Sequence, residues 1–497
     1  MSDNLHRRVR TRFAPSPTGY MHIGNLRTAL YACLYARKEQ GDFILRIEDT
    51  DQKRFVADAV DFIKRTLAAA RIVADEGPDI GGEYGPYIQS QRKDIYQKYA
   101  EELIAAGHAY RCFCDSPDSA EAEPVPADEA DKYRKKPGHC ELCRSLSPEE
   151  SAAKAAQGAP FVIRQLMPSS GPVTFYDIVH GSITIDAGEL EDQVLIKRDG
   201  LPTYNFANVI DDHLMEISHI IRGAEFITST PKHVLLYEFF GWTPPAFIHL
   251  PPVMGKNEDG SVSKLSKRHG STGFAELVEL GYLPEAITNY VALLGWSPKS
   301  NQEIFSMEEM EKAFSLEGLS KSPAVFDYAK LDWFNGEYLK AMDDDAFAAL
   351  ARPYAKEIAD GLGDKWVYLA ALLKTRVARL GEIPEKIDFL PAPHEYTPED
   401  FLNKKNKVTL ELASEIIPAA AALLERIDAD GWTPDNLNGA LHDYIETTGK
   451  KLGAVMWPLR VALSGCRVTP GGVTELLYLL GREESIARLK AASAKLA

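Results

Sequence analysis

The sequence predicts an α/β protein with a doubly wound parallel sheet, an insertion within that sheet domain, and an all-helical carboxyl-terminal domain. Three observations indicate this fold class. A strand, a turn, a helix and a second strand follow one another within the first 50 residues. A segment rich in Pro, Ala and acidic residues begins near Cys112, and strand signals almost vanish beyond about residue 340.

The amino-terminal pattern is that of a βαβ unit. VRTRF is short and extended, and APSPTG then breaks the chain with two prolines and a glycine. From Leu26 to Leu34 apolar residues recur at helical spacing until Gly41 ends the helix, and FILRIED reads as the next strand. A right-handed crossover between two such strands makes them parallel, which predicts a parallel sheet.

The rest of the chain divides by its character. VTFYDIVHGSITI and DQVLIKRDGLPTY are strand-like, and an apolar run follows around HVLLYEFFGW. The segments AFAALARPYAKEIADGL, YLAALLKTRVARL and ASEIIPAAAALLERI have amphipathic helical patterns. We therefore predict four parts: the first half of the sheet domain at 1–111, an insertion at 112–200, the second half at 201–340 and a helical domain at 341–497.

Composition limits the class of protein. With 497 residues and a net charge of −16, the chain is long enough for several domains and is not a polycation, although a local basic surface remains compatible with nucleic-acid binding. The start MSDNLHRRVRTRF has no apolar core of a signal peptide, and no apolar run reaches membrane-spanning length. Only 6 cysteines occur, four of them between Cys112 and Cys143. These features predict a cytoplasmic protein without membrane association.

Two distant segments have the composition of a triphosphate-binding site. His22 and Gly24 stand at the start of the first predicted helix, where unpaired N–H groups and the helix dipole favour phosphate. Lys264-Leu265-Ser266-Lys267-Arg268 places three cations and a hydroxyl after a glycine-containing loop. Taken singly, each has an ordinary alternative: His22 as a helix-capping residue, and the basic segment as a solvated loop.

Together the two segments resemble the HIGH and KMSKS signatures of class I aminoacyl-tRNA synthetases. The blocks RFAPSPTGYMHIGN, LRIEDTDQKR, YGPYIQSQR, LPTYNFANVIDDH and IIRGAEFITSTPKH are similar to those of bacterial-type glutamyl-tRNA synthetases, from about Val9 to the carboxyl terminus. Asn25, Leu265 and Arg268 depart from the generic signatures. The resemblance implies a Rossmann-like catalytic domain, an insertion that binds the tRNA acceptor end and a helical anticodon-binding domain.

The resemblance also implies the chemistry. ATP, accompanied by Mg²⁺, would activate L-glutamate as glutamyl-adenylate, and the 3′-terminal adenosine of tRNA-Glu would then accept the glutamate. Positioning and charge stabilisation suffice for such a reaction. By resemblance His22, Lys264 and Lys267 are the catalytic residues, and the ATP-binding set is His22, Gly24, Glu225, Lys264, Ser266, Lys267 and Arg268.

Glutamate recognition requires a partner for each of its charges. Guanidinium groups bind carboxylates with two parallel hydrogen bonds, and a carboxylate suits the α-ammonium group. The positions that match the family are Arg12, Ser16, Glu48, Tyr204, Asn208 and Arg222. Their ordinary alternatives are a strand-edge charge for Arg12, a structural ion pair for Glu48 and core packing for Tyr204.

The cysteines form two pairs, Cys112-Phe113-Cys114 and Cys140-Glu141-Leu142-Cys143. Four thiolates with this spacing can bind one tetrahedral Zn²⁺, and some members of the family have a structural zinc in this insertion. His139 is a competing fourth ligand, and four buried thiols without metal are the alternative.

The helical region offers candidate anticodon contacts. GKKLGAVMWPLRVALSG combines Lys450, Lys451 and Arg460 with Trp457, and unstacked bases are commonly read by such cations and aromatics. Arg376 matches an arginine with which the family reads the last anticodon base. Core packing is the ordinary role of Trp457.

Three other functions stay open at this stage. A glutaminyl-type or non-discriminating enzyme would also charge tRNA-Gln, but the glutaminyl enzymes usually have β-barrels where this chain is helical. A small-metabolite nucleotidyltransferase with a HIGH signature would have no use for the helical domain. A non-catalytic tRNA-binding relative would not need His22, Lys264 and Lys267. We expect a monomer.

Overall fold

The computed structural model describes residues 8–114 and 140–497. The chain divides into two compact units: the first comprises Met1–Leu277 with Ile287–Asp327, and the second comprises Val278–Ala286 with Tyr328–Ala497. The four-part division predicted above remains a prediction, because the two units reflect how densely residues pack together and not what each part does.

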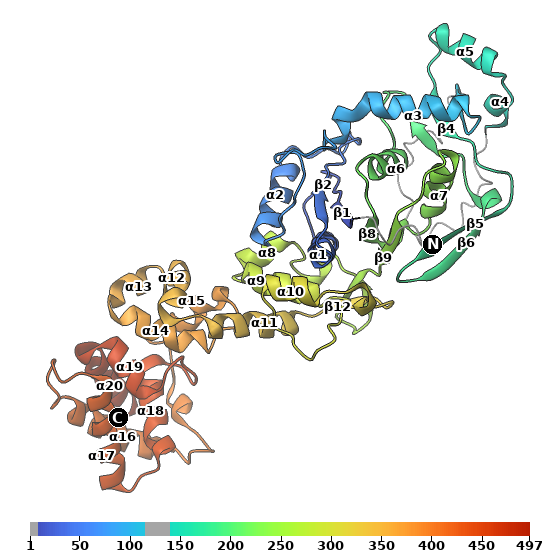
Figure 1. Cartoon of the computed structure of the whole chain (residues 1–497). Coiled ribbons are helices and arrows are strands. Elements are labelled where there is room, and N and C mark those ends of the chain that lie inside the picture. The colour runs from blue at the N-terminus through green and yellow to red at the C-terminus, as the bar shows by residue number, and fades with distance from the viewer. Residues whose placement is uncertain (1–7, 115–139) are drawn as a thin grey trace. The chain divides into compact units, whose positions relative to one another are not determined.

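A mostly parallel sheet forms the centre of the first unit (Figure 1). Strand β1 (Arg10–Phe13) pairs in parallel with β2 (Asp42–Leu45). A second sheet has the order β6-β5-β9-β8, in which β8 (His219–Gly223), β9 (Ala246–Leu250) and β5 (Pro172–Asp177) are parallel and β6 (Gly181–Asp186) is antiparallel. Backbone hydrogen bonding from Ser218 to Arg10 joins β8 to β1, so the two sheets meet edge to edge.

The helices that connect these strands make the sheet doubly wound. Helix α1 (Ile23–Lys38) leads from β1 to β2, and α7 (Thr230–Phe239) leads from β8 to β9 in the opposite direction along the sheet. Right-handed crossovers in opposite directions place the two helices on opposite faces. The strand order therefore reverses between β1 and β8, and the carboxyl ends of strands at such a switch point are where α/β folds bind ligands. This confirms the predicted fold class.

Local sequence explains why the elements near the switch point form. His22 caps α1, because its side chain accepts a hydrogen bond from the Gly24 N–H, and the Asn25 side-chain oxygen accepts one from the His22 backbone N–H. All four residues of β1 are buried, including Arg10 and Arg12, because both faces of the sheet are covered. The two arginines are buried with carboxylate partners, and this is what makes an RTRF strand possible.

A smaller antiparallel sheet, β3-β4-β7, lies within the segment predicted as the insertion. Its strands are β3 (Ala109–Cys112), β4 (Val162–Gln165) and β7 (Val194–Ile196), and the short helices α4 (Glu141–Arg144) and α5 (Pro148–Ala156) belong to the same segment. The hairpin β5–β6 is also in this segment, yet β5 pairs with β9 of the central sheet.

The basic segment KLSKR follows a second hairpin. Strand β10 (Val253–Lys256) pairs antiparallel with β11 (Val262–Lys264) and parallel with β12 (Ala324–Phe326). The 3₁₀ turn η6 (Lys267–His269) comes directly after β11. Further helical elements up to Gly318 are α2 (Ala59–Ala69), η2 (Gln89–Arg92), α3 (Lys93–Ala105), η4 (Ala187–Glu189), α6 (Tyr204–Leu214), η5 (Ala224–Phe226), α8 (Phe274–Glu279), α9 (Pro284–Ala292), α10 (Met307–Ala313) and η7 (Leu316–Gly318).

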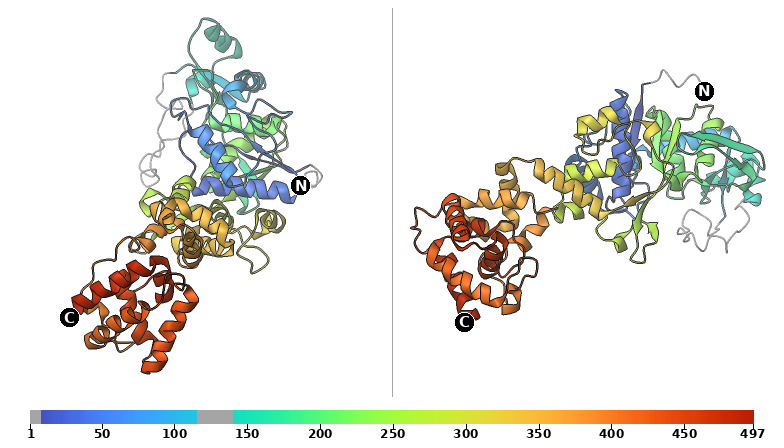
Figure 2. Two further views of the ribbon diagram at one scale, coloured as in Figure 1. Left: turned by 90° about the vertical axis from the view of Figure 1, so that its left-hand side faces the viewer. Right: turned by 90° about the horizontal axis from the view of Figure 1, so that it is seen from below.

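Among the described residues, everything after Phe326 that is regular is helical, as predicted (Figure 2). The elements are α11 (Tyr328–Ala341), α12 (Asp344–Ala355), α13 (Glu357–Leu362), α14 (Lys365–Lys374), η8 (Leu380–Glu382), α15 (Ile383–Ile387), η9 (Pro398–Phe401), α16 (Leu410–Leu424), α17 (Pro434–Thr448), α18 (Leu452–Ser464), α19 (Val473–Leu480) and α20 (Arg482–Leu496). Two apolar clusters stabilise them, one around Phe347 and Trp366 and the other around Ile416 and Leu459. In the described parts of the chain no helix has the length and apolar character needed to cross a bilayer.

Candidate active site

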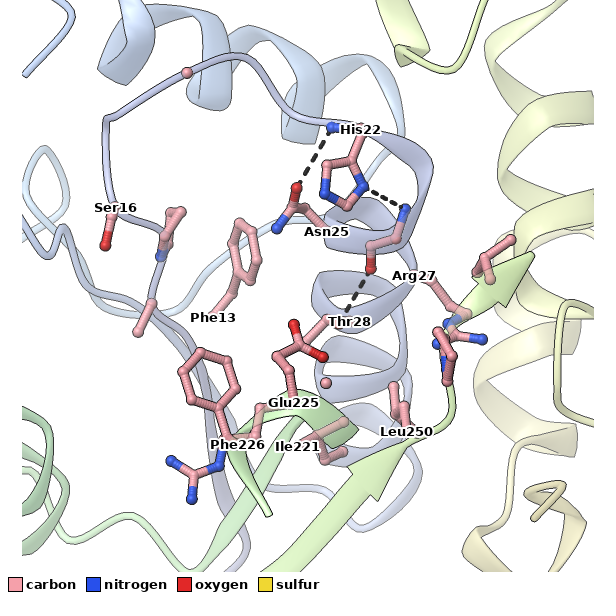
Figure 3. Close-up of a pocket in the computed structure, with 18 of the residues that line it drawn as sticks. Phe13, Ser16, His22, Asn25, Arg27, Thr28, Ile221, Glu225, Phe226 and Leu250 are labelled. Carbon is pink, nitrogen blue, oxygen red and sulfur yellow. Dashed lines mark hydrogen bonds between the residues drawn. The ribbon is translucent and has the colours of Figure 1, made fainter. Parts of the chain in front are cut away.

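A cavity of about 430 Å³ opens at the switch point, between the carboxyl ends of β1 and β8 (Figure 3). Its walls come from the APSPTGYMHIGN segment and α1 on one side and from β8, η5 and the start of the β10–β11 hairpin on the other. The sequence-predicted residues that line it are Arg12, Ser16, His22, Gly24, Tyr204, Arg222, Glu225 and Lys264. Segments more than 200 residues apart thus line one cavity.

Other predicted residues lie outside this lining. Glu48 and Asn208 are buried beside it, and the Asn208 amide contacts Glu48. Ser266 and Arg268 are exposed on the loop after β11, where Arg268 donates to the Ser263 hydroxyl. The Lys267 side chain and His139 are outside the residues that the structure describes.

His22 acts as a capping residue and also faces the cavity (Figure 3). Its Nδ1 accepts the Gly24 N–H at 3.0 Å, so in the neutral ring the hydrogen is on Nε2. Burial, and then the nearby Lys264 ammonium, lower the pKa of His22. A β-carbon on Gly24 would lie 2.8 Å from the His22 ring, so a larger residue there would displace the ring. His22 thus presents one N–H donor at the amino terminus of a helix.

The two signature segments are physically joined. His22 and Gly273 form an isolated antiparallel bridge, and the Ile23 N–H donates to the Thr272 carbonyl at 3.0 Å. Within the loop, His269 accepts the Ser266 N–H at 3.1 Å through Nδ1 and contacts Asn257 at 2.9 Å through Nε2. Its ring lies so close to Gly255 that a β-carbon there would be 2.5 Å away. The basic loop is therefore folded back on its own hairpin.

A buried ion-pair network lies beneath the cavity. Asp212, which is fully buried on α6, accepts from Arg12 Nε and Nη2 at 3.0 and 3.2 Å and from Arg46 Nη1 at 2.8 Å. Burial opposes ionisation of Asp212, but Arg12 and Arg46 outweigh it and lower its pKa. Asp211, the preceding residue, pairs with Arg92 at 2.7 Å.

Glu48 has one satisfied and one unsatisfied oxygen. Its Oε1 accepts from Arg46 at 2.9 Å, whereas Oε2 is buried and has no hydrogen-bond partner among the described residues. Burial raises the pKa of Glu48, although Arg46 and Arg12 oppose this change. Burial and the Glu48 charge together raise the pKa of Tyr204, which lines the cavity, to about 12. A lone buried carboxylate oxygen of this kind is suited to a cationic ligand group.

Arg222 is buried without a carboxylate partner among the described residues. Its Nε donates to His249 Nε2 at 3.0 Å, and its Nη2 donates to the Thr230 hydroxyl at 2.8 Å. Its Nη1 is buried and makes no hydrogen bond to a described residue. Burial lowers the pKa of Arg222. A buried guanidinium on the cavity wall with an unused N–H donor group is a site for an anion.

Sequence reasoning missed the residues that hold these groups. Arg46, Asp211 and Asp212 form the network, and Asp177 and His249 lie behind Arg222. The two adjacent aspartates in YNFANVIDDHL were the available signal, because a helix with apolar residues at core spacing has no other reason to place carboxylates on that face. His249 and Asp177 had no comparable signal.

The four cysteines of the insertion converge. One sulfur from each of Cys112, Cys114, Cys140 and Cys143 lies within 4.8 Å of the others. Cys114 Sγ is 3.4 Å from Cys140 Sγ and 3.6 Å from Cys143 Sγ. Four sulfurs at Zn–S distances of about 2.3 Å in a tetrahedron would be roughly 3.8 Å apart, so this donor set fits one zinc ion.

The two predicted anticodon arginines come from different elements of the second unit and approach each other. Arg376 follows α14 and is exposed, and Arg460 is half-buried on α18. Burial, together with the Arg376 charge, lowers the pKa of Arg460, although Glu475 opposes this change. Arg460 Nε and Trp457 Nε1 have no hydrogen-bond partner among the described residues. This leaves donors and an aromatic ring together on one helix.

Comparison with known families defines the class of protein. Residues 8–333 match the family of tRNA synthetases class I (E and Q), catalytic domain, and residues 335–493 match the family of anticodon binding domains. The fold, the cavity and these matches together define a class I aminoacyl-tRNA synthetase of the glutamate and glutamine branch.

Individual relatives narrow the class further. The chain is 49% identical over 484 residues to a glutamate–tRNA ligase of Clostridium botulinum, covering 97% of this chain and 98% of the relative, and 48% identical over 483 residues to one of Clostridium kluyveri, covering 97% of each. A crystal structure of a glutamate tRNA ligase from Elizabethkingia meningosepticum, in complex with its amino acid, matches with a TM-score of 0.85 and 35% identity, covering 99% of this chain and 100% of that one. The chain belongs to the glutamate–tRNA ligase family.

The ion-pair network predicts a large effect on stability. Asp212→Asn should lower the free energy of unfolding by about 3 kcal/mol, because two buried guanidinium groups lose their carboxylate. Urea denaturation followed by circular dichroism measures this change. Asp199→Asn, which alters a half-exposed aspartate paired with Lys197, is the matched control and should change stability by less than about 1 kcal/mol. Equal stability of the two variants would contradict the role given to Asp212.

Proposed function

We propose that this member of the glutamate–tRNA ligase family uses the switch-point cavity to activate L-glutamate with ATP and then transfers glutamate to the 3′-terminal adenosine of tRNA-Glu. The observation that carries the proposal is a pair of unsatisfied buried atoms at the site, Glu48 Oε2 and Arg222 Nη1. Glutamate has an α-ammonium group and carboxylates, and these are the groups that such atoms bind.

On the ATP side, the α1 amino terminus and the His22 Nε2–H would hold phosphate oxygens, and Gly24 would let the nucleotide approach the backbone. Lys264 lines the same cavity and would neutralise charge on the phosphates, with Lys267 beside it in sequence. Ser266 and Arg268, on the same loop, would complete the ATP-binding set, as would Glu225 on the opposite wall. Mg²⁺ would enter bound to ATP as part of the substrate.

On the glutamate side, Arg222 would bind the side-chain carboxylate through Nη1, and Glu48 would pair with the α-ammonium group. Arg12, Ser16 and Tyr204 line the cavity and would orient the amino acid, with Asn208 held against Glu48. Two nitrogens of Arg12 already donate to Asp212. Arg12 would therefore act on glutamate through its fixed positive charge and its remaining N–H donors.

The reaction needs no covalent intermediate on the protein. An oxygen of the glutamate α-carboxylate attacks the α-phosphorus of ATP, the bond from that phosphorus to the bridging oxygen breaks, and pyrophosphate leaves with the lysines offsetting its charge. A ribose hydroxyl of the tRNA 3′-adenosine then attacks the activated carbonyl, and AMP leaves. The chain's groups bind, orient and stabilise charge in both steps.

The proposal predicts that the purified chain will charge tRNA-Glu with radiolabelled glutamate, and that Arg222→Ala will raise the glutamate KM tenfold to a hundredfold while the ATP KM changes little. An estimate of about 1.5–3 kcal/mol for a hydrogen bond to a charged group gives this range. Arg54→Ala, at an exposed ion pair, is the control. Charging of tRNA-Gln in the same assay would identify a non-discriminating enzyme, and failure to bind any tRNA would favour a small-metabolite nucleotidyltransferase.

For the four-cysteine cluster we propose one structural Zn²⁺ bound by Cys112, Cys114, Cys140 and Cys143. Zinc without a redox or substrate role would hold the Cys112–Cys114 pair against the Cys140–Cys143 pair. The sulfur separations given above support this ligand set.

Elemental analysis of protein purified without chelator should therefore find about one zinc per chain. Cys143→Ser should lose the metal, because a neutral hydroxyl is a poor replacement for thiolate. Cys466→Ser, a half-buried cysteine of the second unit, should keep it. Fully active wild-type enzyme without metal would contradict the zinc proposal.

For the second unit we propose that Arg376 and Arg460 contact the anticodon of tRNA-Glu. Their proximity places two positive charges together on a chain of net charge −16. Trp457, on the same helix as Arg460, packs against an apolar cluster of the second unit. We further propose that the protein acts as a monomer in the cytoplasm, a compartment in which cysteines without disulfide bonds, such as those of this chain, stay reduced.

Arg376→Gln should relax the choice between tRNA-Glu and tRNA-Gln by roughly tenfold to a hundredfold, the range that one base contact of about 1–3 kcal/mol gives. The measurement is the ratio of kcat/KM for the two tRNAs. Arg352→Gln, which removes an exposed arginine paired with Asp360, is the matched control. A uniform loss with both tRNAs would instead make Arg376 a phosphate contact.

A further inference from the structure

A chain of buried polar groups lies directly behind Arg222 and has no part in the chemistry described above. Asp177, at the end of β5, accepts the His249 ring N–H at Nδ1 over 2.7 Å and the His249 backbone N–H over 3.0 Å. His249 lies on β9, and its Nε2 accepts a hydrogen bond from Arg222 Nε over 3.0 Å. All three side chains are buried, Asp177 and His249 completely.

The hydrogen-bond directions in this chain have only one solution. Arg222 Nε can only donate, so His249 Nε2 must be the unprotonated, accepting nitrogen. The carboxylate of Asp177 can only accept, so His249 Nδ1 must hold the hydrogen. Asp177 also accepts the N–H groups of Val179 and His180, at 2.9 and 2.8 Å. These fixed bonds select one neutral tautomer of His249.

The arrangement settles which nitrogen of Arg222 is left for a ligand. Nε is held by His249, and Nη2 is held by Thr230 at 2.8 Å and by His233 Nδ1 at 3.3 Å. Only Nη1 remains without a partner among the described residues. The groups that orient the guanidinium are uncharged, so none of them competes with a ligand carboxylate for the positive charge. The nearest carboxylate in this series of hydrogen bonds, that of Asp177, bonds the His249 imidazole and not Arg222 itself.

We propose that Asp177 and His249 are positioning residues for amino-acid selection: Asp177 fixes the His249 tautomer, and His249 fixes the Arg222 guanidinium with Nη1 toward the cavity. The inference rests on the proposed function, in which Arg222 binds the glutamate side-chain carboxylate. Its consequence is specificity. A guanidinium has donors but no acceptor, so it satisfies both oxygens of a carboxylate but not the NH₂ group of the glutamine amide. When its orientation is fixed it cannot turn away from that NH₂ group, and glutamine is disfavoured.

Two substitutions of His249 separate this role from simple packing. A glutamine amide reaches the place of Nε2, where its carbonyl can accept from Arg222, but an asparagine amide reaches only the place of Nδ1. His249→Gln should therefore keep the glutamate KM within about threefold of wild type, while His249→Asn should raise it about tenfold with little change in the ATP KM. His249→Asn should also activate glutamine relative to glutamate more readily. His219→Gln is the matched control, because His219 lies at the start of β8 and Arg222 near its end.

A double variant tests the route of the effect. If His249 acts through Arg222, His249→Asn should add little to the loss already caused by Arg222→Ala. Asp177→Asn should behave like His249→Asn, with the folded fraction checked by circular dichroism because this carboxylate also holds backbone N–H groups. Equal glutamate KM values for His249→Gln and His249→Asn would overturn the inference, and so would additive losses in the double variant. An Arg222→Ala enzyme with an unchanged glutamate KM would instead overturn the proposed function on which it rests.

Discussion

The site depends on one buried carboxylate with two guanidinium partners. Asp212 extends from α6 to Arg12 on β1 and to Arg46 just beyond β2, and so fixes two adjacent strands to a helix that comes about 170–200 residues later. Arg46 then passes the same constraint to Glu48. None of these charges would be tolerated alone in the interior, and together they hold the floor of the cavity at a defined geometry.

On the side of α1, backbone hydrogen bonds hold the walls of the cavity together. The His22–Gly273 bridge joins the start of α1 to the segment that follows the basic loop, and the Ile23 N–H donates to the Thr272 carbonyl of the same segment. Arg27, one turn into α1, adds hydrogen bonds to the carbonyls of Pro251 and Leu294. The side of the cavity that we propose for phosphate is thus fixed mainly by main-chain groups, and the side that we propose for the amino acid is fixed by charged side chains.

Sequence predicted the fold and the family well because both leave local signals. The βαβ start, the helical region after 340 and the two signatures depend on periodicity or on contiguous motifs. The cysteine cluster was also visible, since its members are paired in sequence. The roles of individual site residues stay predictions. What could not be predicted was the support behind them. Asp177 bonds His249, which is 72 residues away, and Asp212 bonds Arg46 and Arg12, which are 166 and 200 residues away, and no local pattern indicates such pairs.

The β5 strand changes how the chain can be divided. It lies within the segment that the sequence sets apart as an insertion, yet it pairs with β9 and brings Asp177 to His249, behind Arg222. The segment is therefore not a module that can be exchanged for a shorter linker or for its counterpart from another protein. A transplant would have to bring its own carboxylate to His249, so changes in this segment and changes in the surroundings of Arg222 are coupled.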